Sequence, residues 1–367
     1  MISSSSPDVF HQTRIVQLQI KSSNSNLQQM ERKTHTSTVS EYQLDMLEHL
    51  LSVESHTLPN VSLIEQQPEI KLSMRPLLLD FLMEVITILN LSRSTFPLTV
   101  NLIDRYCSTR IVKKQHYQLL GLTSLWISCK NLDPKFKIPT LNDLRKICVD
   151  SYNKELFIEM EKHILKSLEW VVNSPTFDAF VDVFLNMLVS VNDANYSSVI
   201  KKHYNKIKLS SYYLGELFQF YPNMYFEYSS SQIAILAIMS SISTLKLPIN
   251  IMTIMNFYNT LLDNGTMQLS IESFQTVFRA IRVLSLPNSL QQKYCVNHRG
   301  NSNHNNGNNS TNANQNLPPK TPKVSMPLTP GPSPEEKVSR KRHNGHMDSL
   351  MMVHERKRSC IDLGVRI

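Results

Sequence analysis

Glycine is scarce in this chain, at 8 of 367 residues, whereas an average composition has about 7%. Three of the eight (Gly121, Gly215 and Gly265) precede residue 291, and none lies in a GxGxxG, GxxxxGK[ST] or GxSxG pattern. Those patterns need glycine for tight turns and for close approach of backbone to phosphate, so nucleotide loops and nucleophile elbows are excluded. The chain is instead 41% hydrophobic and carries many Phe, Tyr and Met, which favours helices packed on helices.

The chain also lacks any pattern of paired cysteines. Its five cysteines contain no CxxC pair, their number is odd, and no histidine cluster completes a zinc site. We therefore expect reduced thiols, as in the cytosol or nucleus, and neither a metal nor a cofactor.

Long hydrophobic runs are missing as well. The longest, residues 233–239, is far too short to span a bilayer, and residues 1–20 lack the apolar core of a signal peptide. The sequence thus predicts a soluble intracellular protein without a membrane partner.

The positive charge is concentrated at one end of the chain. The net charge is +8, and residues 291–367 hold 12 Lys and Arg against 5 Asp and Glu. Residues 1–290 are nearly neutral. Because nucleic-acid binding needs a clustered basic surface, we expect no nucleic-acid partner.

Residues 41–175 show apolar positions at helical spacing in successive segments. A short helix is expected from about Tyr42. The five helices that follow it are expected over about 74–89, 94–106, 115–129, 141–148 and 154–168. Thr140 and Asp143 are expected to form a capping box, Asn153 to cap the next helix, and Ser73 to cap the helix that begins at residue 74. The segment 115–129 is apolar nearly all round, so it is expected at the centre of a bundle.

Residues 176–290 repeat this rhythm without residue-level identity to the first set. The expected helices span about 177–188, 199–220, 232–242, 249–262 and 271–284, and the third is again the most apolar. The sequence therefore predicts an all-α protein of two consecutive five-helix bundles.

The two ends of the chain have polar compositions. Residues 1–40 are rich in Ser, Gln, Asn and Thr, and residues 297–316 contain ten Asn. Such segments cannot bury enough apolar surface to fold. We predict a disordered leader over 1–40, an N-terminal helix with the first bundle over 41–175, a degenerate second bundle over 176–290, and a disordered tail over 291–367.

Several spaced motifs resemble the cyclin box. The segment Met74–Val85, MRPLLLDFLMEV, is similar to the opening helix of that family, usually written MRxxLxDWLxEV. Residues 100–106 (VNLIDRY), 118–130 and 160–176 resemble the signatures that follow it in the same order. The resemblance covers residues 41–176 and implies a cyclin fold for the first bundle. The second bundle matches the family only in the rhythm of its helices, and we expect it to be a degenerate second cyclin fold.

Among the cyclins, the sequence most resembles the fungal G1/S cyclins. Phe81 stands where mitotic cyclins carry Trp, and the leader shows no convincing destruction box. The Asn-rich tail with its Ser/Thr-Pro steps also suits a yeast protein. The implied function is a regulatory subunit that binds and activates a cyclin-dependent serine/threonine kinase at the G1/S transition, without being an enzyme itself.

The family resemblance implies roles for matched positions. Lys130 and Glu161 match residues that bind the kinase, and Tyr42, Asp45 and Met46 match the helix that extends this contact. Arg75 and Asp104 match a salt bridge that joins the first two helices of the box. A patch that docks substrates in some cyclins corresponds to Met74, Leu77, Leu78, Phe81, Glu84 and Gln118, most of which also fit a core by periodicity.

The tail carries candidate regulatory signals. Thr321, Thr329 and Ser333 each precede Pro, the step that such a kinase phosphorylates, and a ubiquitin ligase would read the phosphates. Two basic clusters resemble a two-part nuclear import signal, which predicts a location in nucleus and cytoplasm. They comprise Arg340, Lys341, Arg342, Arg356, Lys357 and Arg358.

Two other functions compete with this interpretation. A general transcription factor of the TFIIB type also uses paired cyclin folds, but it needs a basic bundle surface and usually a zinc ribbon, neither of which is visible here. A helical scaffold without a kinase is the other alternative. Under the cyclin interpretation, the partners are the kinase subunit, its substrates and inhibitors, and the ubiquitin ligase.

Overall fold

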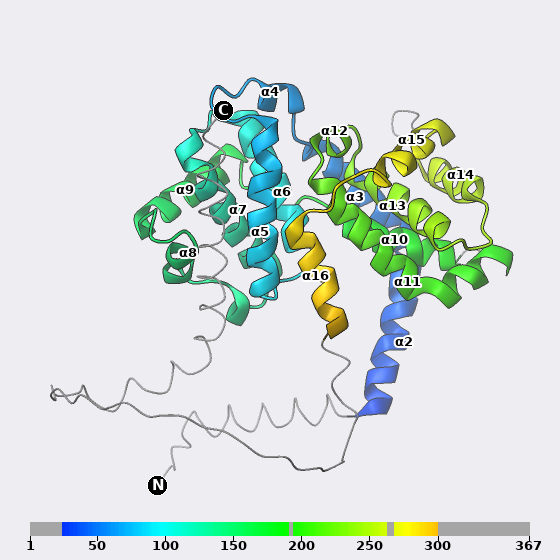
Figure 1. The fold of residues 1–367 in the computed structure, drawn as a ribbon. Helices are drawn as coiled ribbons and strands as arrows, with labels where there is room; N and C mark the ends of the chain where they lie inside the picture. Colours follow the sequence, from blue (N-terminus) through cyan, green and yellow to red (C-terminus); the bar gives the residue numbers. More distant parts are fainter. Residues whose placement is uncertain (1–23, 191–193, 263–267, 300–367) are drawn as a thin grey trace, which may run out of the picture. The chain divides into compact units, whose positions relative to one another are not determined.

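The computed structural model describes residues 24–190, 194–262 and 268–299, which are helical and contain no strand (Figure 1). The predicted all-α class is thereby confirmed. The helices are α2 (Ser25–Glu41), α3 (Gln43–His56), α4 (Val61–Glu65), α5 (Arg75–Ile88), α6 (Thr95–Thr109), α7 (Tyr117–Leu132), α8 (Leu141–Ile147), α9 (Lys154–Ser167), α10 (Phe177–Ser190), α11 (Ala194–Gln219), α12 (Pro222–Tyr225), α13 (Ser230–Thr244), α14 (Ile251–Leu261), α15 (Ile271–Ile281) and α16 (Asn288–Arg299).

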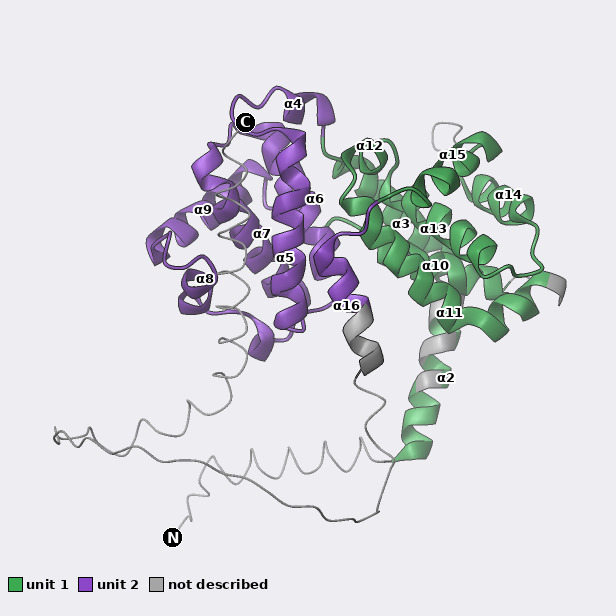
Figure 2. Ribbon diagram, in the orientation of Figure 1, with its two compact units in different colours: residues 1–59, 173–284 green, residues 60–172, 285–367 purple. Residues whose placement is uncertain are grey.

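The helices form two compact units, coloured separately in Figure 2. Unit 1 takes its described residues from 1–59 and 173–284, and unit 2 takes its own from 60–172 and 285–367. The helices α5–α9 of unit 2 and the helices α10, α11, α13, α14 and α15 of unit 1 correspond to the two expected sets.

Unit 2 is built around α7, as the sequence predicts. Its residues 119–129 are all buried, and α7 packs against α5, α6 and α9. Gly121 permits the close approach of α5, because a Cβ at this position would lie 2.8 Å from Leu78 Cδ1. Thr140 and Asp143 form the predicted capping box of α8, and Asn153 caps α9. Ser73 does not cap α5, because a 3₁₀ turn over Leu72–Met74 leads into that helix.

Unit 1 repeats this plan around α13. Residues 233–242 of α13 are buried throughout, and the helix contacts α10, α11, α14 and α15. Gly215 has the role in α11 that Gly121 has in α7, because a Cβ there would overlap the ring of Phe177 at the start of α10. In each unit, one small residue thus lets a helix approach its neighbour closely.

The structure differs from the sequence prediction at three helices, which are α2, α3 and α16. All but the last residue of α2 falls in the expected leader, and α3 belongs to unit 1 although the sequence division joins it to the first bundle. The helix α16 packs on α5 of unit 2, with Leu290 fully buried. Asp80 of α5 accepts hydrogen bonds from Ser289 N (3.1 Å) and Ser289 Oγ (2.6 Å), which satisfies the start of α16.

Candidate functional site

Lys130 and Glu161 meet on the surface of unit 2. Lys130 lies near the end of α7, and its Nζ is 2.6 Å from Oε1 of Glu161 on α9. The side chains of Lys130 and Glu161 are 38% and 18% exposed. The ammonium of Lys130 also lies 3.1 Å from the centroid of the Trp126 ring, one turn earlier on α7. The two residues expected to bind a kinase are therefore brought together and oriented.

Trp126 is a part of this site that the sequence prediction left in the core. A ring and an ammonium four residues apart lie on the same side of a helix, and this spacing was the available signal. Trp126 is 9% exposed, so its ring holds Lys130 in place while the ammonium stays accessible.

An ion pair at this level of exposure is well suited to exchange partners. Pairs in contact with water contribute about 0–1 kcal/mol because solvent screens them. Breaking the Lys130–Glu161 contact therefore costs little, and each group can form charge-assisted hydrogen bonds with a second protein. Ile158, one turn before Glu161 on α9, adds a side chain that is 37% exposed.

Tyr42, Asp45 and Met46 lie in unit 1, at the junction of α2 and α3. Tyr42 ends α2 and precedes α3. All three side chains are exposed, with Tyr42 at 50% and Met46 at 41%, whereas the adjacent Leu47 is 2% exposed. Leu44, which the sequence prediction did not single out, is 57% exposed. This end of α3 thus offers a mixed apolar and acidic surface.

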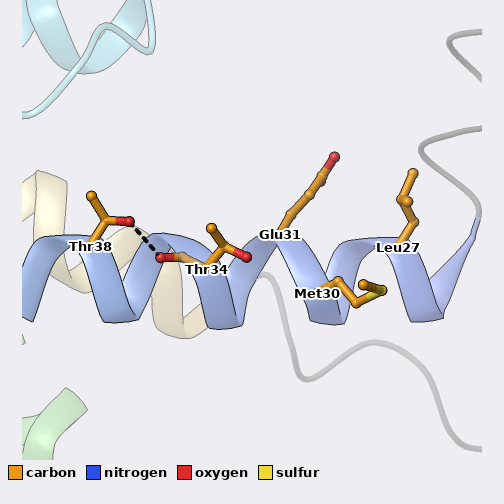
Figure 3. Close-up of a pocket in the computed structure, with 5 residues that line it drawn as sticks. All are labelled: Leu27, Met30, Glu31, Thr34 and Thr38. Atoms are coloured by element: carbon orange, nitrogen blue, oxygen red, sulfur yellow. Dashed lines mark hydrogen bonds between the residues drawn. The ribbon is translucent and has the colours of Figure 1, made fainter.

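The helix α2 continues that surface toward the N-terminus. A shallow depression there is lined by Leu27, Met30, Glu31, Thr34 and Thr38, which occupy one side of the helix (Figure 3). Thr38 Oγ1 donates a hydrogen bond to the carbonyl oxygen of Thr34 at 2.9 Å, within the same helix.

Arg75 and Asp104 form a bidentate salt bridge between α5 and α6. Arg75 Nε donates to Asp104 Oδ1 at 2.9 Å, and Nη2 donates to Oδ2 at 2.7 Å. The two side chains are 2% and 3% exposed. Burial acts to raise the pKa of Asp104, and the charge and hydrogen bonds of Arg75 act to lower it. The pair is therefore inaccessible to a partner and joins the first two helices of the box.

The six residues of the expected substrate-docking patch differ in exposure. Leu77 is 73% exposed, whereas Leu78 and Glu84 are each 7% exposed. The remaining three, Met74, Phe81 and Gln118, are half-buried. Leu78 is buried because α7 approaches it at Gly121, so the side chain that a docked substrate can readily reach is Leu77.

The expected regulatory residues of the tail lie outside the described residues. They are Thr321, Thr329, Ser333, Arg340, Lys341, Arg342, Arg356, Lys357 and Arg358.

Neither a metal centre nor a membrane span is found in the described part of the chain. No group of three His, Cys, Asp or Glu side chains there could hold a metal ion, and no helix there is long and apolar enough to cross a membrane. Cys107, Cys129 and Cys148 are buried free thiols. Burial raises the pKa of each of them, which disfavours the reactive thiolate.

Comparisons with known proteins agree on one family. The model of the cyclin N-terminal domain matches residues 45–173. The G1/S-specific cyclin CLN2 of Candida albicans is 64% identical over 312 residues, covering 79% of this chain and 67% of that protein. The G1/S-specific cyclin CLN3 of Saccharomyces cerevisiae is 36% identical over 264 residues, covering 63% of this chain and 45% of that protein.

A solved structure shows the same fold. A viral cyclin from herpesvirus saimiri aligns with a TM-score of 0.52 at 20% identity, covering 68% of this chain and 99% of that one. The chain belongs to the cyclin family. Cyclins are regulatory subunits of cyclin-dependent kinases, so the chain is a kinase regulator of the fungal G1/S type and not itself an enzyme. The transcription-factor and scaffold alternatives are set aside on this basis.

Proposed function

We propose that the chain binds a cyclin-dependent kinase catalytic subunit through Lys130 and Glu161 in unit 2 and through Tyr42, Asp45 and Met46 in unit 1. The observation that carries the proposal is the exposed Lys130–Glu161 pair, whose weak internal contact leaves both charges available. The exposed start of α3 supplies a second surface of suitable chemistry.

Activation follows from binding one state of the kinase better than the other. A cyclin that contacts the regulatory helix of the kinase only in its active position shifts the equilibrium toward that position. The Lys–Glu pair that holds ATP then forms within the kinase, which performs the phosphoryl transfer. The cyclin contributes activation and timing at the G1/S transition.

The contact is tested with Lys130→Ala and Glu161→Ala, measured by surface plasmon resonance against the purified kinase. Each variant is expected to weaken binding about tenfold, equivalent to about 1.4 kcal/mol, because a charged contact at the interface is lost. Lys202→Ala, an exposed lysine of α11, is the matched control and should bind like the wild type. Unchanged affinity in both variants would remove this pair from the interface.

The tail is proposed to control the lifetime of the protein. Phosphorylation of Thr321, Thr329 and Ser333 would add about −1.5 to −2 charge at each site and create a signal for a ubiquitin ligase. A triple Ala variant should persist longer after translation is stopped. An unchanged half-life would contradict this proposal.

The basic clusters are proposed to direct nuclear import, which gives the protein a nuclear as well as a cytoplasmic pool. A fluorescent reporter fused to residues 335–367 should enter the nucleus. Replacing Arg340, Lys341 and Arg342 with Ala should leave the fusion cytoplasmic, and a fusion that never accumulates in the nucleus would count against the signal.

Substrate docking is proposed at Leu77, the exposed member of the expected patch. Leu77→Ala should slow phosphorylation of particular protein substrates and leave the rate on a generic short peptide unchanged. Equal rates on every substrate would exclude docking here. Leu78→Ala is unsuitable for this purpose because Leu78 is packed against Gly121.

A further inference from the structure

The helix α3 is held in unit 1 by an unusual pair of buried side chains. Only Leu47 and Glu54 of this helix are buried, and each is 2% exposed. They are seven residues apart and therefore lie on one side of the helix. A helix that needed only hydrophobic attachment would carry an apolar residue at position 54, since burying a carboxylate is costly unless it is well satisfied.

The carboxylate of Glu54 is satisfied by the first turn of α13. Oε1 accepts a hydrogen bond from the backbone N–H of Ser231 at 2.8 Å, and Oε2 accepts one from Ser231 Oγ at 2.7 Å. Ser231 is fully buried, and Ser229 and Gln232 form the capping box of the same helix end. The partial positive charge of a helix N-terminus adds to the attraction. Glu54 thus joins α3 to α13 by a directional contact.

This contact has a geometric consequence for the exposed end of α3. Asp45 is nine residues from Glu54, which is half a turn more than two full turns, so the two lie on opposite sides of the helix. Fixing Glu54 and Leu47 against unit 1 therefore keeps Asp45 outward. Tyr42 and Met46 share the exposed end, about 12 Å or more from Glu54 along the helix axis.

We propose that Glu54 is a positioning residue for kinase binding, which acts by fixing the orientation in which α3 presents Tyr42, Asp45 and Met46. This inference rests on the proposed function of those three residues. Glu54 itself is 2% exposed, so its role does not require direct contact with the kinase. Its role is to make the kinase-facing surface preformed, so that binding does not have to order α3.

The test is a double-mutant cycle on the full-length chain, with kinase affinity as the measured quantity. Glu54→Ala removes the anchor and should weaken binding on the order of tenfold. The same substitution in a Tyr42→Ala/Met46→Ala background should have a much smaller effect, because the surface that Glu54 orients is already gone. Glu54→Gln keeps the length and one acceptor and should retain most of the affinity.

A general loss of stability is separated by a matched control. Ser211→Ala removes a buried hydroxyl of unit 1 that donates to Ile207 O at 2.8 Å and lies 3.2 Å from Ser241 Oγ, away from α3. It should lower the melting temperature without weakening kinase binding. Ser231→Ala, which removes a single hydrogen bond of Glu54, should give an intermediate loss of affinity. This variant replaces Glu54→Ala in the test if Glu54→Ala folds poorly.

Two outcomes overturn the inference alone: a folded Glu54→Ala variant that binds the kinase like the wild type, or an equal loss in both backgrounds. Wild-type chain that binds no cyclin-dependent kinase overturns the proposed function and the inference with it. If Tyr42→Ala/Met46→Ala leaves binding unchanged, α3 is not part of the interface and the inference is overturned, whereas binding through Lys130 and Glu161 is decided by their own variants.

Discussion

Replacing Arg75 with Ala tests whether the buried salt bridge holds the first two helices of the box together. The substitution removes both hydrogen bonds to Asp104, which is 3% exposed, and leaves its carboxylate buried without that partner. Removing one partner of such a buried pair costs about 3–5 kcal/mol. The total stability of a protein is about 5–15 kcal/mol, so the substitution removes at least about a fifth of it. The expected fall in melting temperature is roughly 10 °C.

The pH dependence of this loss is also determined by the pair. Burial raises the pKa of Asp104, and Arg75 opposes that effect. Without Arg75 the pKa of Asp104 rises further. Between the ordinary pKa of 3.8 and this raised pKa, Asp104 is protonated in the folded variant and ionised in the unfolded chain. The stability deficit of Arg75→Ala is therefore smallest at acidic pH and grows as the pH rises through the raised pKa.

Thermal unfolding monitored by circular dichroism gives both quantities, and kinase pull-down is run on the same samples. The double variant Arg75→Ala/Asp104→Ala should lose less than the sum of the two single losses. Lys130→Ala, from the exposed pair, should change stability by about 1 kcal/mol or less. The structural role of the Arg75–Asp104 pair would be refuted if Arg75→Ala melted at the wild-type temperature, or if the stability losses of the two single variants simply added in the double variant. Wild-type melting with lost kinase binding would instead move Arg75 to the contact surface.

Three further predictions concern packing, ionisation and docking. Gly215→Ala should destabilise unit 1 by about 1–3 kcal/mol, because the added methyl meets the ring of Phe177; an unchanged denaturation midpoint would contradict that packing. Burial raises the pKa of Glu54, and the hydrogen bonds of Ser231 only partly oppose it. The unfolding free energy of the wild type relative to Glu54→Gln should therefore fall as the pH rises above 4.5 toward the raised pKa. A pH-independent difference would refute this. The burial-raised pKa of the neighbouring Tyr258 keeps its hydroxyl from titrating in that range. Leu77→Ala should leave the melting temperature unchanged, since that side chain is 73% exposed, and a clear loss of stability would mean that it packs.

Local signals in the sequence predicted the helices well. The periodicity of apolar residues located the helices of both sets, and the uniformly apolar segments became the central helices α7 and α13. The caps at Thr140 and Asn153 depend on residues three positions apart, so they too could be read locally. The motif predicted that Lys130 lies on the exposed side of α7. The pairing of Lys130 with Glu161 on α9 became visible only in the structure.

Long-range contacts account for what the sequence did not reveal. The Ser289–Asp80 contact that starts α16 joins residues 209 positions apart, and the Ser231–Glu54 contact that fixes α3 joins residues 177 positions apart. No helical period reports such partners. The polar composition around α2 and α16 predicted disorder, although both segments form helices. Composition alone cannot show which apolar surface will cover a helix.

The central claim is that this cyclin binds and activates a cyclin-dependent kinase, and co-purification tests it most directly. The full-length chain is expressed with an affinity tag in synchronised yeast cells and recovered, and the eluate is assayed for histone H1 kinase activity and for DNA binding. We expect kinase activity that peaks around the G1/S transition and falls with Lys130→Ala/Glu161→Ala. Recovery of the intact chain without kinase activity, or with DNA binding in its place, would contradict it.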